Sequence, residues 1–355
     1  MENKFNYKML ILARESRGLN QSELAEKTGL PQSTISRIEH GFVAKVDDET
    51  INTLSSYLNY PKSFFNQSFN IFPHNLYYRK RLKVNAKTIN KAEAIMNIYR
   101  ANVQSLLKSV DLPETNIPII DETRDGKPDR VAMYLRQFWK IPKGPIMDLT
   151  KLLEGKGIII IPLDFDTEHI EGLSMITDTG NYIIFLNNAF PGDRQRLTLA
   201  HELGHLIMHL SSVNGVDENV DVEKEAFLFA SEFLMPKNEI AHNYKTRLTI
   251  NKLIDLKRYW KVSMQAILKW GQELGEVDYN RARYLWAQFN TMGIKKKEPF
   301  DLPKEKPSLL QEIINMHYSK DIGFTKKELA DILCLSVKEF EQKYATERPT
   351  LSRIA

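Results

Sequence analysis

The segment "TLAHELGHLIMH" (residues 198–209) places three histidines and a glutamate on one apolar stretch. His201 and His205 are four residues apart, so on a helix both side chains project from the same face, one turn apart. That spacing lets two imidazoles reach one metal ion, and Glu202 is placed to take a proton from a water molecule at the metal. The competing interpretation is an ordinary helix with satisfied histidines. We interpret His209 as a neighbouring or packing histidine.

A third metal ligand elsewhere in the sequence would favour the metal site over an ordinary helix. A catalytic zinc site is commonly formed by two histidines and a glutamate, with one position left open. The motif extension that supplies a third histidine is excluded, because Met208 and Ser211 stand where glycine and histidine are required. An amphipathic helix is expected over 223–236, and its glutamates are candidates in the order Glu223, Glu225 and Glu232. The first is preferred because it leads the helix.

Three blocks of sequence resemble the ImmA/IrrE metallo-endopeptidases. They are "RQRLTLAHELGHLIMH" (194–209), "EKEAFLFASEFLMP" (223–236) and "LKRYWKVSMQAILKWGQELG" (256–275). The resemblance covers roughly residues 132 to 292. It implies a zincin-like α+β domain that hydrolyses peptide bonds, with Zn²⁺ as cofactor. It also implies that His201, His205 and Glu223 hold the zinc ion and that Glu202 is the general base.

Residue 227 departs from the pattern of that family. In the family block E-x-x-A-[N/D]-x-F-A, Ala226, Phe229 and Ala230 match, but Phe227 stands where asparagine or aspartate is usual. A polar residue there would orient a ligating imidazole, and losses of this kind weaken metal affinity or activity roughly 10–100-fold. Phe227 therefore favours a domain that binds without cutting, whereas the intact His-Glu-x-x-His motif favours a protease.

The segment "QSELAEKTGLPQSTISRIEHG" (21–41) has the spacing of a helix-turn-helix. Ala25 is the small residue where two helices meet, Gly29 supplies the turn, and Ile35 and Ile38 face the core. Over residues 6 to 68 the chain resembles the Cro/λ-repressor-type (XRE family) DNA-binding domains. This resemblance implies that the second helix enters the major groove of operator DNA.

Five outward side chains are expected to contact double-stranded DNA: Gln21, Gln32, Ser33, Ser36 and Arg37. Gln21 would contact phosphate, Gln32 would pair with adenine, and Arg37 would bind guanine or phosphate. The competing interpretation is a module that recognises protein, because residues 1–70 carry eight cations and eight acids. Operator half-sites usually come in pairs, so a homodimer is a further expectation.

Changes in composition and the turn-forming glycines and prolines divide the 355 residues into four parts. We expect a five-helix helix-turn-helix domain over 1–70, a basic helical linker over 71–130, a zincin-like domain over 131–292, and a linker with a small helical tail over 293–355. In the third part, "GIIIIPLDF", "EGLSMIT" and "NYIIFLNN" predict a small antiparallel sheet. The predicted fold class is therefore multidomain and mainly α.

The tail carries a weaker helix-turn-helix echo in "TKKELADILCLSVKEFEQKY" (325–344), where Cys334 replaces the turn glycine. A helical cap or a dimerisation element is expected there. Because Cys334 is the single cysteine, an intramolecular disulfide and a cysteine-based zinc cluster are excluded. The absence of a signal peptide and of an apolar run of roughly 20 residues predicts a cytoplasmic protein with no membrane partner.

The two modules together predict a DNA-binding regulatory zinc protease. Members of the resembled peptidase family cut a helix-turn-helix repressor, often encoded beside them, so the resemblance implies a repressor protein as substrate. Cleavage would derepress stress or mobile-element genes. The alternative is a transcriptional regulator in which the peptidase-like domain senses a ligand or binds a partner without cutting.

Overall fold

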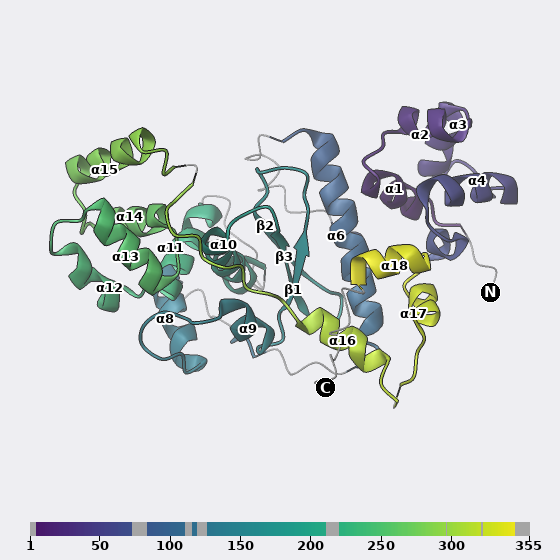
Figure 1. The fold of residues 1–355 in the computed structure, drawn as a ribbon. Helices are drawn as coiled ribbons and strands as arrows, with labels where there is room; N and C mark the ends of the chain where they lie inside the picture. The colour runs from purple at the N-terminus through teal and green to yellow at the C-terminus, as the bar shows by residue number, and fades with distance from the viewer. Residues whose placement is uncertain are drawn as a thin grey trace, which may run out of the picture.

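The computed structural model describes residues 5–72, 84–110, 116–118, 126–210, 220–295, 297–320 and 322–344. Helices predominate, and a small sheet lies in the middle of the molecule (Figure 1). Four cations of the predicted basic linker, Arg79, Lys80, Arg81 and Lys83, lie outside the described residues. Within the described ranges, no helix is long and apolar enough to cross a membrane.

The N-terminal domain consists of α1 (Tyr7–Ser16), α2 (Gln21–Thr28), α3 (Gln32–Glu39), α4 (Asp48–Leu58) and the 3₁₀ helix η1 (Lys62–Asn66). Asn20 begins α2 with a reciprocal capping box, in which its side chain accepts a hydrogen bond from the backbone of Glu23. Gly29 ends α2 in the left-handed region at φ 71°, which turns the chain into α3. Ile35 and Ile38 are buried. The predicted helix-turn-helix domain is therefore confirmed, with its fifth helix of the 3₁₀ type.

The sheet contains β1 (Ile159–Leu163), β2 (Gly172–Ile176) and β3 (Tyr182–Asn187), in the order β1-β3-β2. The three predicted strands are confirmed, but the prediction of an antiparallel sheet is wrong because β1 and β3 are parallel. A short turn joins β2 to β3 and makes that pair antiparallel. Strand β3 then lies between its two neighbours, so its other edge meets β1 running in the same direction. Apolar runs alone do not reveal this order.

Successive residues of the strands point into two different cores, because side chains alternate across a sheet. Ile160 and Ile184 pack into the core around the histidine-rich helix, whereas Ile159 and Phe185 pack on the other side. The first core is completed by α8 (Pro128–Phe138), α9 (Leu149–Glu154), α10 (Gly192–Gly204), α11 (Val222–Leu234), α12 (Lys237–Tyr244), α13 (Ile250–Trp260), α14 (Met264–Glu273) and α15 (Tyr279–Thr291).

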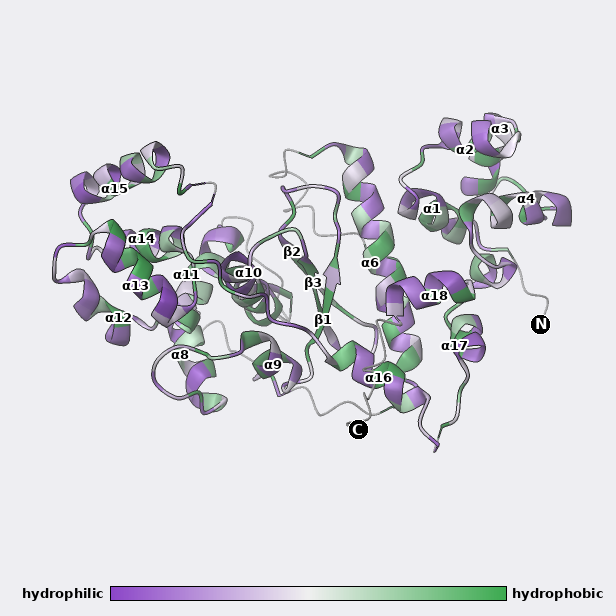
Figure 2. Cartoon of the chain, viewed as in Figure 1, coloured by the Kyte–Doolittle hydropathy of each residue, from purple (hydrophilic) through white to green (hydrophobic). Residues whose placement is uncertain are grey.

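The long helix α6 (Ala86–Leu106) lies between the sheet and the N-terminal domain (Figure 1). Its apolar residues join α1, β1 and β3 to the tail helices α16 (Leu309–His317), α17 (Lys326–Ile332) and α18 (Val337–Tyr344) in the second core. Figure 2 shows hydrophobic residues along α6 and α16, where these helices approach the sheet. The N-terminal domain and the tail are therefore packed on a common support.

Polar contacts also attach the tail to the N-terminal half. Arg17 donates to the two carboxylate oxygens of Glu339 at 3.1 and 2.8 Å. Asn102 on α6 donates to the hydroxyl of Tyr344 at 2.9 Å. The segment with the weak helix-turn-helix echo thus caps the N-terminal domain of its own chain through α18.

Phe340 tests this attachment, because its side chain is fully buried in the second core. Replacing a buried phenylalanine by alanine destabilises a protein by about 3–5 kcal/mol. We therefore expect Phe340→Ala to lower the melting temperature and to accelerate amide hydrogen exchange in α1 as well as in α18. The exposed Val337→Ala on the same helix is the control. Unchanged exchange in α1 would contradict a stabilising role for the tail.

Candidate metal centre

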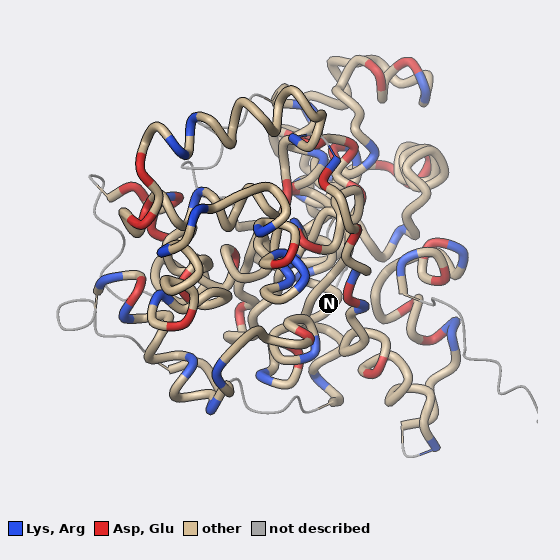
Figure 3. The backbone as a smooth tube through the Cα atoms, turned by 60° about the vertical axis from the view of Figure 1, so that its left-hand side comes forward, with Lys and Arg blue, Asp and Glu red and all other residues tan. Residues whose placement is uncertain are grey.

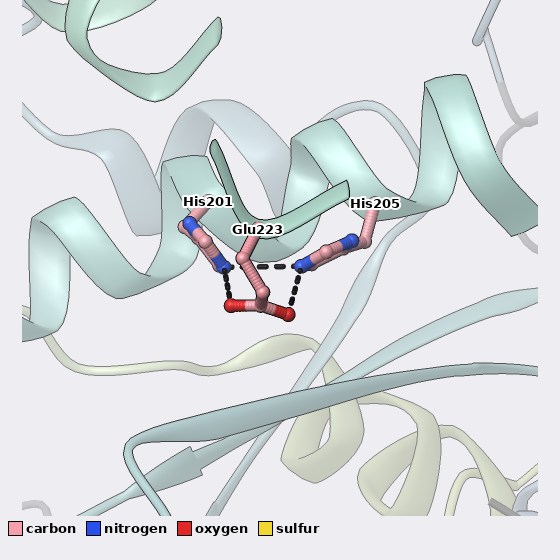
Figure 4. Close-up of side chains that lie close together, drawn as sticks. All are labelled: His201, His205 and Glu223. Atoms are coloured by element: carbon pink, nitrogen blue, oxygen red, sulfur yellow. Dashed lines mark hydrogen bonds and ion pairs between the residues drawn. The ribbon is translucent and has the colours of Figure 1, made fainter. Parts of the chain in front are cut away.

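His201, His205 and Glu223 converge on one point (Figure 4). His201 lies near the end of α10, His205 begins the π-helical turn η2 (His205–Leu210), and Glu223 lies in the first turn of α11. The Nε2 atoms of His201 and His205 are 3.0 Å apart. Glu223 places Oε2 at 3.4 Å from Nε2 of His201 and Oε1 at 3.4 Å from Nε2 of His205.

These separations fit a zinc ion. Tetrahedral ligands at the usual zinc distances of about 2.0–2.1 Å lie about 3.3 Å from one another. The observed distances between the ligand atoms, 3.0 and 3.4 Å, are close to this ligand–ligand separation. Imidazole nitrogen and carboxylate oxygen are also donors that zinc accepts readily. The three side chains therefore form a donor set of suitable chemistry and size.

The pKa values of His205 and Glu223 favour the protonation states in which these groups bind metal, a neutral imidazole and an ionised carboxylate. Burial lowers the pKa of His205 to about 4, so its imidazole is neutral at pH 7. Burial opposes the charge of Glu223, but hydrogen bonds to His201 and His205 outweigh this and hold the pKa of the carboxyl well below its usual range. The pKa of His201 is raised, because its bond to Glu223 and the charge of Glu202 outweigh burial. The carboxylates thus create a local preference for positive charge.

Helix α11 can bring Glu223 to the histidines because Gly204 has no side chain. A Cβ atom at Gly204 would lie 3.0 Å from the ring of Phe229 and 3.4 Å from the Cα of Ala226. At the start of α11, the side chain of Asp221 accepts a hydrogen bond from the backbone of Lys224 and fixes the first turn. The glycine inside the His-Glu-x-x-His motif thus sets the distance between the two helices.

Glu202 lies beside the cluster in a buried setting, with 2% of its surface exposed. Ser174 on β2 donates a hydrogen bond to its Oε2 at 2.9 Å. Burial raises the pKa of Glu202 to about 7, although His201 and Ser174 act against the shift. A carboxyl group with a pKa near the working pH is well suited to accept a proton and return it.

Strand β2 approaches Glu202 closely because residue 172 is glycine. A Cβ at Gly172 would lie 2.6 Å from the Cγ2 atom of Thr198 and 3.3 Å from the Cγ atom of Glu202. Ser174 and Gly172 were not predicted as site residues. The available signal was the glycine within an otherwise apolar strand, which often marks the close approach of another segment.

A pocket of about 280 Å³ opens at the cluster. It is lined by His169, Ile170, Glu171, Gly172, Leu173, Leu197, Thr198, His201, Glu202, Glu223 and Phe227. The ring of Phe227 lies 3.6 Å from Nζ of Lys269 and contributes an apolar surface to the pocket. No motif marks His169 or Glu171 in the sequence, because both lie on the loop that leads into β2.

The other candidate ligands have different partners. Oε2 of Glu225 is 3.1 Å from Nε2 of His209. Both oxygens of Glu232 accept hydrogen bonds from the backbone of Lys237, which is the first residue of α12. His209 places its Nδ1 at 2.9 Å from Nδ1 of His205, on the side of that ring remote from the cluster. Glu225 and Glu232 therefore do not belong to the cluster of His201, His205 and Glu223, and His209 contacts this cluster through the ring of His205.

The predicted DNA-contacting residues gather at the start of α2 and along α3. Gln32, Ser33 and Arg37 are exposed, whereas Ser36 and Gln21 are half-buried. The side chain of Gln32 donates to Oε1 of Gln21 at 2.8 Å, which ties the two helices together. Cations and acids are interspersed along the described chain (Figure 3). In α2 and α3, Lys27 and Arg37 stand among Glu23, Glu26 and Glu39.

A buried network that sequence reasoning did not identify supports these residues. Gln21 donates to Oε2 of Glu39 at 2.8 Å, and Arg14 donates to Oε1 of the same carboxylate at 2.6 Å. Glu39 is 4% exposed, at the end of α3. Gln21 is therefore held by two residues of α3, because it donates to Glu39 and accepts from Gln32. Its contact with phosphate stays a prediction.

Two family models match the chain. Residues 153–269 match a peptidase family described as the IrrE N-terminal-like domain, and residues 10–65 match a helix-turn-helix family. No curated protein matches the chain. The first match spans the sheet and the whole His-His-Glu cluster, and the second spans α2 and α3. The chain is thus similar to a helix-turn-helix family over residues 10–65 and to the IrrE N-terminal-like peptidase family over residues 153–269, as the two resemblances predicted.

Gly204→Ala tests how the cluster is assembled. The added methyl group would push Phe229 and α11 away by a few tenths of an ångström and move Glu223 from the histidines. We expect zinc affinity to fall about tenfold, a loss typical of disturbed supporting contacts. Competition titration with a chromophoric chelator measures this. Adding Phe229→Leu should restore part of the affinity, and equal affinity in Gly204→Ala and wild type would contradict the prediction.

Proposed function

We propose that the chain is a DNA-binding zinc metallo-endopeptidase that acts in the cytoplasm and cleaves a helix-turn-helix repressor. Cleavage would derepress stress or mobile-element genes. The observation that carries this proposal is the convergence of His201, His205 and Glu223 beside the buried Glu202 at the pocket. The fusion to a helix-turn-helix domain supports the regulatory setting, because it would take the peptidase to the DNA where such a repressor sits.

The residues of the pocket have separable roles in this reaction. Bound by His201, His205 and Glu223, zinc would polarise the scissile carbonyl, lower the pKa of a water molecule and favour ionised Glu202. Glu202 accepts the proton of the attacking water and then delivers it to the nitrogen of the leaving amine. The hydrogen bond from Ser174 holds the carboxylate in place during both transfers.

Strand β2 offers a binding edge for the substrate. Within the described residues its strand partner is β3, and Gly172 and Leu173 line the pocket. An extended peptide can add to such an edge through main-chain hydrogen bonds. We propose that the repressor is bound in this way, with its scissile bond beside Glu202.

Glu202→Gln tests the protease directly. Removing the general base should slow cleavage of the repressor encoded beside this gene by about 10²–10⁴-fold, because general acid–base catalysis contributes that much. Zinc content should be unchanged, since Glu202 is not one of the three proposed ligands. Cleavage is followed by mass spectrometry of the products, and metal content by atomic spectroscopy.

The alternative is a regulator that does not cut, and the aromatic side chain of Phe227 at the pocket favours it. That function requires wild type and Glu202→Gln to leave the repressor equally intact while both regulate the promoter. Such a result would refute the protease and retain the DNA-binding function.

We further propose that α3 binds operator DNA as part of a homodimer, with Gln32, Ser33, Ser36 and Arg37 at the interface. A side-chain contact to a base is worth about 1–3 kcal/mol, so Arg37→Ala should weaken binding to the promoter of its own gene by roughly 10–100-fold. Fluorescence anisotropy at fixed salt measures this, with the exposed Lys327→Ala in the tail as control. Wild-type affinity of Arg37→Ala would remove α3 from the interface.

A further inference from the structure

Glu225 and His209 form a row of hydrogen bonds that ends on the outer nitrogen of His205. Oε2 of Glu225 is 3.1 Å from Nε2 of His209, and Nδ1 of His209 is 2.9 Å from Nδ1 of His205. We infer that Glu225 and His209 are positioning residues that select the tautomer of His205 and so present its Nε2 lone pair to the metal. This inference rests on the proposed zinc site and names two residues that support it.

The direction of each hydrogen bond follows from the chemistry of the groups. An ionised carboxylate only accepts, so Nε2 of His209 carries the hydrogen in its bond to Glu225. A neutral imidazole protonated on Nε2 has an acceptor at Nδ1, which therefore receives the hydrogen of Nδ1 in His205. His205 is then unprotonated at Nε2, the atom that faces His201 and Glu223. One carboxylate thus determines the tautomers of two rings.

The row of hydrogen bonds is largely shielded from solvent. The side chains of His205 and His209 are 3% and 6% exposed, so water competes little for their nitrogens. Glu225 is 32% exposed and forms the solvent end of the row. Because Glu223 and Glu225 belong to the first turn of α11, that turn contacts three histidines of α10 and η2.

The row also accounts for a departure noted in the sequence. A polar residue at position 227 was expected to orient an imidazole, but Phe227 lines the pocket under Lys269. His205 instead donates its outer hydrogen bond to His209, one turn further along the chain. Outer partners of metal-ligating histidines fix ring orientation and raise ligand basicity. His209 and Glu225 can therefore supply the support that position 227 lacks.

Two substitutions of His209 separate positioning from packing. His209→Phe keeps a buried ring but has no acceptor for the hydrogen of His205, so zinc affinity should fall about 10–100-fold. His209→Gln provides a carbonyl acceptor and should stay closer to wild type. A residue that only fills space would give the opposite order. Apo protein is titrated with zinc against a chromophoric chelator, and circular dichroism confirms that each variant is folded.

Glu225→Ala tests the outer end of the row at a half-exposed position. It should weaken zinc binding, whereas the exposed neighbour Lys224→Ala should not. In the His209→Phe background, Glu225→Ala should have no additional effect, because the row is already broken. An additive loss would show that Glu225 acts through its charge alone and would overturn the inference.

Nitrogen NMR of zinc-loaded protein gives an independent signature, because His205 should carry its proton on Nδ1 in wild type. If wild-type protein binds zinc and His209→Phe binds it equally well, the positioning role is overturned while the proposed metal site stands. If wild-type protein binds no zinc, the proposed function fails together with the site on which the inference rests.

Discussion

The close approach of α10 and α11 at Gly204 is the contact on which the metal centre depends. It brings the first turn of α11 to the face of α10 and η2 that carries the histidines. From that position Glu223 meets His201 and His205, while Glu225 meets His209. A wider spacing would separate the carboxylates from all three rings. The geometry of the cluster therefore depends on how α10 packs against α11, because the contact at Gly204 sets the distance of Glu223 from the two histidines.

The parts of the structure that sequence could predict are those with a local signature. His201 and His205 are separated by about one helical turn, and Ala25, Gly29 and the following isoleucines lie within 14 consecutive residues. Glu223 required more, because it lies on another helix and was preferred through its place in that helix and the family block. Partners that are remote in sequence were missed. Ser174 is 28 residues from Glu202, and Arg14 is 25 residues from Glu39.

The arrangement of whole elements was predicted less well than their positions. The strands were located, yet the insertion of β3 between β1 and β2 leaves no trace in their composition, because all three are apolar. The tail was expected to be helical, and the structure adds the partners of α18 through Arg17 and Asn102. In both cases the missing information concerns which buried surfaces meet, and side chains of similar hydrophobicity do not distinguish among partners.

Gly172 has a second consequence for β2, beyond admitting the helix. A sheet that is apolar on both faces does not specify its own alignment by hydrophobicity, since a slip of one residue exchanges one buried face for the other. In the observed pairing, Gly172 lies opposite Leu186, and its missing side chain leaves room for Thr198. A slip would place Glu171 or Leu173 against that threonine. Gly172 therefore fixes the register of β2, because only a residue without a side chain fits against Thr198.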